Sequence, residues 1–511
     1  MKFNLISNKI AEIDVDTIIL SCFMSDDSTN GLVHDTDVEL NGTISEILSR
    51  GDHEGKLREV TEIYTSGQIP AHRIILVGLG PENTFNEDCI RHAASAAAMR
   101  ARQLGASKIA SIIHGVEQSK LSAKDAVRAA TEGTMLALYV FNKYKSENKF
   151  GSIESVSFIE PENIQSEDLL KGIEQGNIIS NAVQLARDLV NEPPNVCTPA
   201  FLAEQARQID DDPNTDVSIL TEPEIEDLNM GAFLSVGRGS TRKPRFIVIE
   251  YNKKLLDKVQ PLVLVGKAIT FDTGGYSLKS ASGMSTMKAD MAGGAAVIGA
   301  LQAAGQLKVP YPVIGLIPAT ENMVSGTASH PSDVVSASNG KTIEIVNTDA
   351  EGRLILADAL VYAAKYNPKH VIDLATLTGS AVIALGEGSA AALFSNETSL
   401  IEQLLTASES SGERIWHMPL YSEYTDWMKA SNVADLRNST EKRDSGIGTS
   451  AAFLQEFTEG YRWAHIDIAP MAFLSGTGVI KRLGPAGATG FGVRLLSHLM
   501  LEYENQQNTN N

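Results

Sequence analysis

Short apolar segments alternate with longer segments of helical periodicity along most of this chain, and this alternation limits the folds that it can adopt. The first part carries apolar runs at residues 18–22, 73–77, 108–113 and 156–159, with helical patterns at 89–104 and 123–144. Strands and helices in alternation favour a parallel or mixed sheet covered by helices. We therefore predict an α/β fold for this part.

The alternation resumes after residue 198, with apolar runs at 246–250, 262–265, 313–317 and 370–374 and helical patterns at 294–304 and 354–365. Between the two parts lies an amphipathic helix whose apolar residues recur at helical spacing: Ile178, Ala182, Leu185, Ala186 and Leu189. Pro193 and Pro194 forbid its continuation. A chain of 511 residues is too long for one hydrophobic core. We predict a smaller α/β domain at 1–165, a connecting helix at 166–195, and a larger α/β domain with a central mixed sheet at 196–511.

Charge and cysteine content narrow the functional classes. The formal net charge of −20 repels nucleic acid phosphates and anionic lipid, so we do not expect nucleic acid as a partner. The three cysteines, Cys22, Cys89 and Cys197, form no CxxC pair and indicate neither a disulfide framework nor a thiolate zinc site. No segment approaches an apolar span of membrane length, and polar residues interrupt the apolar ones at the N-terminus, unlike in a signal peptide. We expect a cytoplasmic protein that does not bind membranes.

Two neighbouring segments carry residues suited to metal binding. VGKAITFDTGG places Lys267 and Asp272 beside an apolar strand, where ligands gather in open α/β sheets. SLKSASGMSTMKADMAGGAAV contributes Lys279 and Asp290, and Asp290 lies in an apolar run where a buried carboxylate needs a cation or several donors. Each segment has a structural alternative, which is a surface turn for the first and a helix cap for Asp290.

A third segment, NTDAEGRLILADAL, places Asp349, Glu351 and Arg353 directly before a helix. Acidic residues commonly occupy the first turn of a helix because the helix dipole favours them, so capping is an alternative here as well. The segment nevertheless supplies more acceptors than one cap requires, and the arginine could neutralise the acidic pair or orient an anion. A fourth segment, DLATLTGSAVIALG, is a strand that runs into a turn suited to lining a cleft.

The residues singled out in these segments are four carboxylates, two lysines and one arginine, and none is a histidine. None of the ten histidines forms HExxH or an HxH pair, and the chain has no GxSxG and no Walker motif. Oxygen-rich ligation suits divalent ions such as Mg²⁺, Mn²⁺ or Zn²⁺. The residues alone therefore predict a carboxylate metal site without naming a reaction.

These segments resemble the leucyl aminopeptidase family, also called the cytosol aminopeptidases. NTDAEGRL at 347–354 matches the family's signature, and VGKAITFDTGG, SLK, MKADMAGGAAV, ENMVSG and DLATLTG flank it in the family's order. NEPPNVCTP, MGAFLSVGRGS, RIWHMPL and WAHIDIA are further landmarks, and the likeness covers residues 185–499. The resemblance implies a macro-like N-terminal domain and a catalytic C-terminal domain. It also implies a homohexamer that removes leucine or other apolar residues from the free N-terminus of peptides.

The resemblance further implies roles for individual residues. One divalent ion, Mn²⁺ or Zn²⁺, would be held by Lys267, Asp272, Asp290 and Glu351, and a second by Asp272, Asp349 and Glu351. The family's catalytic positions fall on Lys279 and Arg353, and Arg353 would hold a bicarbonate ion that shuttles the proton. The family's substrate pocket falls on Met287, Thr376 and Gly379.

This arrangement has a clear chemical rationale. Two neighbouring cations lower the pKa of a bridging water and generate hydroxide near neutral pH, while Lys279 would stabilise the developing oxyanion. Lys267 would have to bind as a neutral amine, because an ammonium has no lone pair to donate. The chain departs from the family at Thr273 (FDTGG for FDSGG), Ala268 (GKA for GKG) and Ser285, which replaces an acidic residue. None of these is an implied ligand, so the departures bear on pocket selectivity.

Two other functions fit parts of the pattern. Carboxylate-rich sites with two metals also serve phosphoryl transfer, so a two-metal phosphoesterase is one alternative. A macro-like binding scaffold with an inactive metal site is the other. Hydrolysis of an aminoacyl amide rather than a phosphate ester, and its recovery with metal after chelation, would separate the three.

Overall fold

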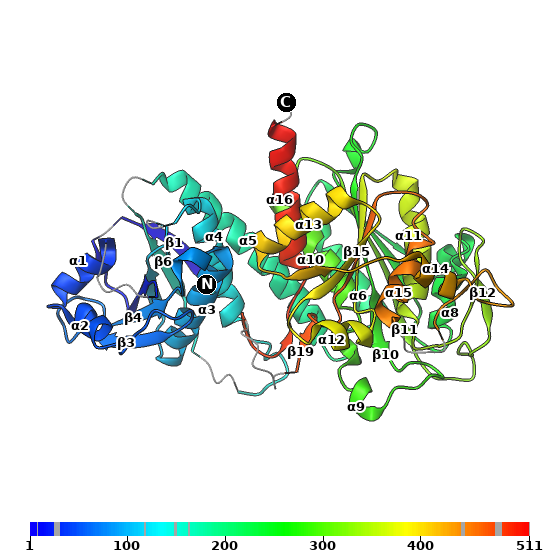
Figure 1. Cartoon of the computed structure of the whole chain (residues 1–511), viewed down its shortest axis with the longest axis horizontal. Helices are drawn as coiled ribbons and strands as arrows, with labels where there is room; N and C mark the ends of the chain where they lie inside the picture. Colours follow the sequence, from blue (N-terminus) through cyan, green and yellow to red (C-terminus); the bar gives the residue numbers. More distant parts are fainter. Residues whose placement is uncertain are drawn as a thin grey trace. The chain divides into compact units, whose positions relative to one another are not determined.

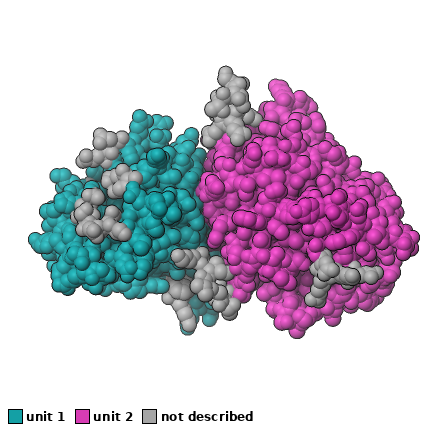
Figure 2. All heavy atoms as spheres, in the orientation of Figure 1, with its two compact units in different colours: residues 1–181, 481–485 teal, residues 182–480, 486–511 magenta. Residues whose placement is uncertain are grey.

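The computed structural model describes residues 1–7, 9–24, 31–116, 119–147, 151–161, 164–440, 445–475 and 483–509. The chain divides into two compact units (Figure 2). Unit 1 comprises residues 1–181 and 481–485, and unit 2 comprises residues 182–480 and 486–511. The division falls inside the helix α5 (Ser166–Asn191). The predicted two-domain α/β architecture is confirmed, whereas the likeness of unit 1 to a macro domain stays a prediction.

Unit 1, whose strands are drawn in blue to cyan in Figure 1, is built on a six-stranded sheet in the order β1-β6-β5-β2-β4-β3. Its strands are β1 (Lys2–Ile6), β2 (Thr17–Cys22), β3 (Val60–Tyr64), β4 (Arg73–Gly78), β5 (Lys108–Ser111) and β6 (Ser155–Ile159). The pairings are parallel except that of β3 with β4. This matches the sheet predicted from strands that alternate with helices.

Helices cover both faces of this sheet. They are α1 (Gly31–Glu39), α2 (Thr43–Ser49), α3 (Glu87–Gln103), α4 (Ala123–Leu138) and the first part of α5, with short 3-10 helices η1 (Ile10–Glu12) and η2 (Glu82–Thr84). Ile18 of β2 packs in the core that includes α2, whereas Ile19 packs in the core that includes α3 and α4. Burial on both faces explains why the strands are continuous apolar runs. The helix predicted to end at residue 144 ends at Leu138, because Tyr139 turns to an extended backbone conformation.

Unit 2 contains a nine-stranded mixed sheet in the order β16-β15-β18-β14-β9-β11-β8-β7, with β10 paired to β11. The strands are β7 (Thr215–Leu220), β8 (Arg245–Tyr251), β9 (Leu262–Gly266), β10 (Ala268–Asp272), β11 (Val313–Asn322), β14 (His370–Ala375), β15 (Ala391–Ser395), β16 (Ile415–His417) and β18 (Trp463–Asp467). Strands β18, β14, β9 and β11 are parallel neighbours, whereas β8 joins β11 and β15 joins β18 antiparallel. The predicted central mixed sheet is confirmed.

The helices of unit 2 lie on both faces of the sheet. They are α6 (Pro199–Arg207), α7 (Glu222–Asp227), α8 (Gly231–Gly237), α9 (Ala281–Met284), α10 (Ala292–Gln306), α11 (Gly352–Ala363), α12 (Gly379–Leu385), α13 (Thr398–Ser411), α14 (Ser422–Met428), α15 (Gly446–Gln455) and α16 (Val493–Thr509). In β11, Ile314 and Leu316 pack in the core that includes α11, while Gly315 faces Val297 and Leu301 of α10. Because alternate residues of a strand point to opposite faces, α10 and α11 cover opposite sides.

Smaller elements complete unit 2. They are the 3-10 helices η3 (Gln208–Asp211), η4 (Lys253–Leu255), η5 (Met287–Ala289) and η6 (Ala364–Tyr366), and the strands β12 (Val334–Ser336), β13 (Thr342–Glu344), β17 (Leu436–Arg437), β19 (Phe473–Leu474) and β20 (Gly487–Ala488). Strands β12, β13 and β17 form one small sheet, and β19 pairs with β20. Within the described residues, none of the helices combines the length and the apolar character needed to cross a membrane. The parallel strands β9, β10, β11 and β14 end at one edge of the large sheet, and such edges bind ligands in α/β proteins.

Candidate metal centre

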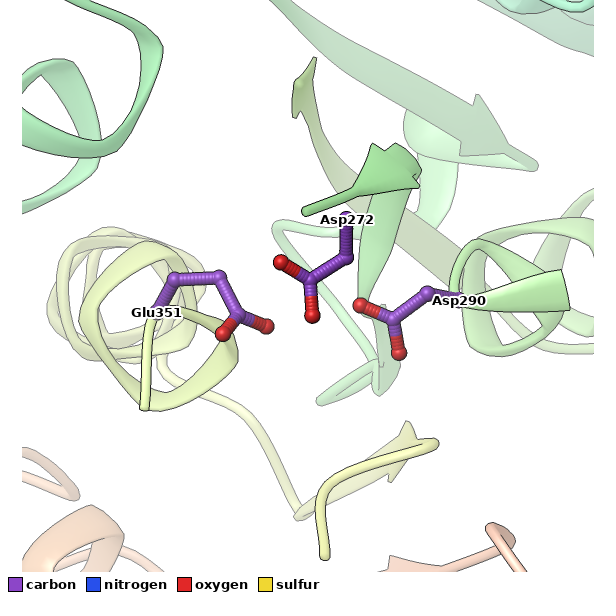
Figure 3. Close-up of side chains that lie close together, drawn as sticks. All are labelled: Asp272, Asp290 and Glu351. Carbon is purple, nitrogen blue, oxygen red and sulfur yellow. The ribbon is translucent and has the colours of Figure 1, made fainter. Parts of the chain in front are cut away.

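Three buried carboxylates meet at this edge of the sheet. Asp272 is the last residue of β10, Asp290 directly follows η5, and Glu351 directly precedes α11. Each offers one oxygen that lies within 4.8 Å of the oxygens of the other two. Figure 3 shows their side chains pointing toward one another. Three carboxylates from three chain segments thus face a common point, and such proximity is costly unless cations compensate.

Lys267 is the first of two cations in this cluster. It follows β9, and its Nζ lies 2.8 Å from Asp290 Oδ1 and 2.8 Å from Glu351 Oε1. The same Nζ donates a hydrogen bond to the Thr376 carbonyl oxygen at 2.9 Å. A Cβ at Gly352 would stand 2.6 Å from Lys267 Cε, so a larger residue at the start of α11 would displace the lysine side chain from this position.

Lys279 is the second cation, and it approaches the carboxylates by a different route. Its Nζ lies 2.8 Å from Asp272 Oδ2 and 2.5 Å from Asp349 Oδ1. The loop that carries it leaves β10 through Gly274 and Gly275, whose φ angles are +85° and +61°. Such angles favour glycine. The loop thereby turns back over the end of β10 and brings Lys279 to the cluster.

Asn322 is a site residue to which the sequence assigned no role. It ends β11, and its Nδ2 donates hydrogen bonds to Asp272 Oδ1 at 2.8 Å and to the Thr348 carbonyl at 3.0 Å. The Gly274 amide donates a second hydrogen bond to Asp272 Oδ1, also at 2.8 Å. One oxygen of Asp272 is therefore held by two donors, which fixes the orientation of the carboxylate. The only sequence signal was the position of Asn322 in the ENMVSG block, since its neighbours here come from distant segments.

Burial and mutual repulsion control the protonation of these groups. Burial raises the pKa of the Asp272 carboxyl to about 6, and the charge of Glu351 adds to the rise. Burial also raises the pKa of Asp290 well above its ordinary value. Burial alone would raise the pKa of Glu351 too, but the positive charges of Lys267 and Lys279 have the larger effect and lower it. Burial disfavours both ammonium groups, yet the surrounding carboxylates prevail and raise the pKa of each lysine.

The donor set fits divalent cations. Asp290 Oδ2 and Glu351 Oε2 are buried and have no hydrogen-bond partner among the described residues, although buried polar atoms are nearly always paired. Four carboxylates face only two lysines, so the cluster retains an excess of negative charge. Carboxylate oxygens are suitable ligands for Mn²⁺ and Zn²⁺. An added cation would satisfy both the unpartnered oxygens and the charge.

The surface turn and the helix caps that the sequence also allowed are not found in the structure. Lys267 and Asp272 are each 2% exposed, so they do not form a surface turn. Asp290 accepts a hydrogen bond from the Thr376 hydroxyl at 2.7 Å and pairs with Lys267, and the N-cap of α10 is Met291. Glu351 occupies the N-cap position of α11, but its side chain makes no capping hydrogen bond. Neither acid therefore serves as a helix cap.

Arg353 lies in the first turn of α11 and is buried. Its Nη1 donates to the Asn438 carbonyl at 2.7 Å and its Nη2 donates to Ser450 Oγ at 2.6 Å. Burial lowers the pKa of Arg353 to about 10. Within the part of the chain that the structure describes, its Nε is buried without a hydrogen-bond partner. The suggested neutralisation of the acidic pair by Arg353 is not seen, because the lysines make the ion pairs with Asp349 and Glu351.

The three residues expected to shape a substrate pocket surround the cluster to different extents. Thr376 touches it directly, through its hydroxyl to Asp290 and its carbonyl to Lys267. Met287 is half-buried at the start of η5, three residues before Asp290. Gly379 is exposed at the start of α12, which Thr378 caps with its side chain. The contacts of Met287 and Gly379 do not themselves define a pocket.

Comparison with known proteins gives a consistent result over the whole chain. Residues 184–497 match the catalytic domain of the cytosol aminopeptidase family, and residues 19–148 match its N-terminal domain. A probable cytosol aminopeptidase of Alkaliphilus oremlandii is 39% identical over 99% of this chain and 100% of its own length. Another, of Roseiflexus castenholzii, is 41% identical over 91% of this chain and 94% of its own.

Solved structures agree with these relatives. A mutant of tomato leucine aminopeptidase superposes with a TM-score of 0.87 at 33% identity, covering 98% of this chain and 96% of its own. The bottromycin maturation enzyme BotP, solved in complex with Mn, gives 0.83 at 32% identity, covering 96% of this chain and 99% of its own. The resemblance seen in the sequence is confirmed. The chain belongs to the cytosol aminopeptidase family and is an aminopeptidase.

Proposed function

We propose that this aminopeptidase is metal-dependent and holds two divalent ions, Mn²⁺ or Zn²⁺, at the buried carboxylate cluster. The observation that carries the proposal is the convergence of Asp272, Asp290 and Glu351, with buried oxygens on Asp290 and Glu351 that lack hydrogen-bond partners. A relative of the same fold, BotP, was solved in complex with Mn. Divalent ions are therefore the best match to this donor set.

The ion pairs of the two lysines support two separate positions for metal ions. Lys267 pairs with Asp290 and Glu351, whereas Lys279 pairs with Asp272 and Asp349, so positive charge is held at two points. We assign the first ion to Lys267, Asp272, Asp290 and Glu351, and the second to Asp272, Asp349 and Glu351. Lys267 can serve as a ligand only after it loses its proton, which a bound cation favours.

The residues around these ions would then have different roles in peptide hydrolysis. Two divalent ions, when bound, polarise the scissile carbonyl and make hydroxide available near neutral pH. Lys279 places its ammonium on the open side of the cluster, where it can donate to the oxygen that becomes negative in the transition state. A substrate with a free α-amine offers a further nitrogen ligand, which a blocked or internal residue lacks. This difference gives selectivity for the N-terminal residue.

Arg353 is proposed to hold a small anion, such as bicarbonate, that relays the proton. Its guanidinium is fixed by Asn438 and Ser450, while its Nε is left without a partner. Met287, Thr376 and Gly379 are proposed to contact the side chain of the N-terminal residue, with leucine and other apolar residues preferred. A cleavage profile across aminoacyl amides, repeated with Met287→Ala, tests that preference. An unchanged profile would remove Met287 from the pocket.

A single experiment tests the proposed function. The purified protein is treated with a chelator, dialysed, and assayed on a leucyl amide and on an aryl phosphate ester before and after Mn²⁺ or Zn²⁺ is added. We expect amide hydrolysis to disappear on chelation and to return with metal, with no phosphatase activity. Full activity of a protein shown to be free of metal would refute the metal dependence, and phosphate ester hydrolysis would favour a phosphoesterase.

We also propose a homohexamer, which rests on the family alone. Light scattering of the active protein tests it, and a stable, active monomer would contradict it. The cytoplasmic location expected from the sequence stays a prediction.

A further inference from the structure

The position of Lys279 depends on a loop with little stiffness of its own. The loop leaves β10 through Gly274 and Gly275, and both have the left-handed φ angles that glycine adopts without strain. Glycine pairs leave a backbone many accessible conformations. The base of the loop is held where the Lys279 amide donates to the Thr273 carbonyl at 3.0 Å and Thr348 Oγ1 donates to the Gly274 carbonyl at 2.6 Å. The residues between Gly275 and Lys279 make the contacts that hold the rest of the loop.

The inner side of the loop is anchored by Ser277. Its amide donates to Thr348 Oγ1 at 2.8 Å, and the Thr348 amide donates to Ser277 Oγ at 3.2 Å. Ser277 and Lys279 thus both point toward the cluster. The alternate residues Tyr276 and Leu278 are turned outward, since their exposed fractions are 43% and 62%.

The outer side of the loop is anchored by Tyr276. Its hydroxyl donates to the Ser325 carbonyl at 2.9 Å, and its ring stacks on His330 with centroids 5.0 Å apart and planes 21° apart. The segment that receives these contacts is itself fixed, because Thr327 Oγ1 donates to the Arg238 carbonyl and Ser329 Oγ donates to the Ser235 carbonyl, each at 2.7 Å. Tyr276 therefore ties the loop to a firm support.

We propose that Tyr276 is a positioning residue, which with His330 holds the loop so that the Lys279 ammonium faces the reacting carbonyl. This inference rests on the proposed function, in which Lys279 stabilises the oxyanion. Tyr276 points away from the carboxylates and acts only through the loop. If the Lys279 ammonium moves away from the oxyanion, it stabilises the transition state much less, whereas substrate binding elsewhere is unaffected.

The kinetic signature of this role is a selective loss of kcat. Tyr276→Ala removes the stack and the hydrogen bond, and we expect kcat to fall about two- to tenfold with KM nearly unchanged. Tyr276→Phe keeps the ring on His330 and should recover part of the loss. Leu278→Ala is the matched control, because Leu278 is the other outward residue of the same loop and its side chain has no polar group. Its kcat should stay within twofold of the parent value.

A double-mutant cycle on the full-length protein separates positioning from general damage. If Tyr276 acts through Lys279, Tyr276→Ala should lower kcat in the parent but not in Lys279→Ala. Equal losses in both backgrounds, or no loss in the parent, would overturn the inference.

Amide hydrogen exchange over residues 277–279 supplies an independent readout. Exchange should be faster in Tyr276→Ala than in Leu278→Ala at equal thermal stability, and equal protection in the two variants would also overturn the inference. Undiminished kcat of Lys279→Ala would instead overturn the proposed role of Lys279. The exchange data would still decide whether Tyr276 fixes the loop.

Discussion

Buried charges gather in each of the two units, and the two clusters are built from different cations. In unit 1, Arg91 and Arg128 face Glu87 and Glu132 between α3 and α4. Arg91 Nε lies 2.5 Å from Glu132 Oε2 with both side chains fully buried, and Arg128 Nη2 lies 2.9 Å from Glu87 Oε2. Arg128 Nη1 also lies 2.8 Å from Asp125 Oδ1, so two arginines pair with two glutamates and one partly exposed aspartate. An arginine keeps its proton in proteins, so the positive charge of this cluster is fixed.

The cluster of unit 2 is built on lysines instead. Four carboxylates share two lysines there, and buried oxygens of Asp290 and Glu351 have no hydrogen-bond partner among the residues that the structure describes. A lysine can lose its proton and become a ligand, which an arginine cannot. The contrast indicates how a structural cluster differs from a functional one. Arginines with paired carboxylates accompany a role in packing, whereas lysines with unpartnered carboxylate oxygens accompany a place for added cations.

The sharpest test of this contrast changes one glutamate in each cluster to glutamine. Glu351→Gln should lower kcat on the order of a thousandfold or more, because the amide cannot hold two cations as a carboxylate does. Glu132→Gln makes the same change in unit 1 and should leave kcat per folded molecule unaltered. Steady-state kinetics and metal analysis of both folded variants provide the measurement. Near-normal turnover of Glu351→Gln would contradict the assignment of Glu351 and its neighbours as the catalytic metal site.

The next largest effect is expected for Lys279→Ala. Loss of a donor aimed at the oxyanion should lower kcat about a hundred- to thousandfold, with KM little changed and both metals retained. Metal content measured beside kinetics on a leucyl amide distinguishes the roles. A lost metal ion would make Lys279 a ligand, and an unchanged kcat would make it a bystander.

A smaller effect is expected from pH. The pKa of Asp272 in the metal-free protein is raised to about 6, so protons compete with metal below that value. Affinity for Mn²⁺ should fall more steeply below about pH 6 than above it, by roughly a further tenfold for each pH unit, because Asp272 then takes up a proton in addition to the one that Lys267 must lose. The sign follows from the raised pKa, because proton loss must precede binding. Calorimetric titration between pH 5 and 7.5 measures this dependence, and an affinity that does not vary below pH 6 would contradict it.

The smallest effect on activity is expected in unit 1. Glu132→Ala leaves Arg91 buried without that partner and should lower the free energy of unfolding by about 3–5 kcal/mol. Replacing both partners, as in Arg91→Met with Glu132→Leu, should restore most of that stability. In both variants kcat per folded molecule should change less than twofold. A large loss of kcat in the stable double variant would show that the unit 1 cluster also serves catalysis.

The comparison also shows which features could be read from the sequence. Apolar runs predicted the central strands because strands buried on both faces must be apolar throughout. The periodicity around residues 139–144 continued the pattern of α4, although the backbone leaves the helix at Tyr139. The local spacing of apolar residues indicates that a segment is amphipathic. It does not indicate where tertiary packing ends the helix.

The site was harder to read than the fold. The residue types alone predicted a carboxylate metal site, and the family resemblance grouped the individual residues. Asn322 was missed as a partner of Asp272, because the contact depends on β10 and β11 ending side by side. The role of Tyr276 in the Lys279 loop was equally hidden, since its partners lie about fifty residues further along the chain. Pairing between distant segments is set by strand order, which local periodicity does not contain.

Because the proposed ligands lie at the ends of several strands, the concentration of free metal ion affects how much of the protein stays folded. These ligands come together only when β9, β10 and the starts of α10 and α11 are in place, so the unfolded chain lacks the site. Binding therefore adds to the free energy of unfolding, by about 2.7 kcal/mol when the free ion is a hundredfold above its Kd. A cell that runs short of the ion would lose folded protein to degradation as well as catalytic turnover.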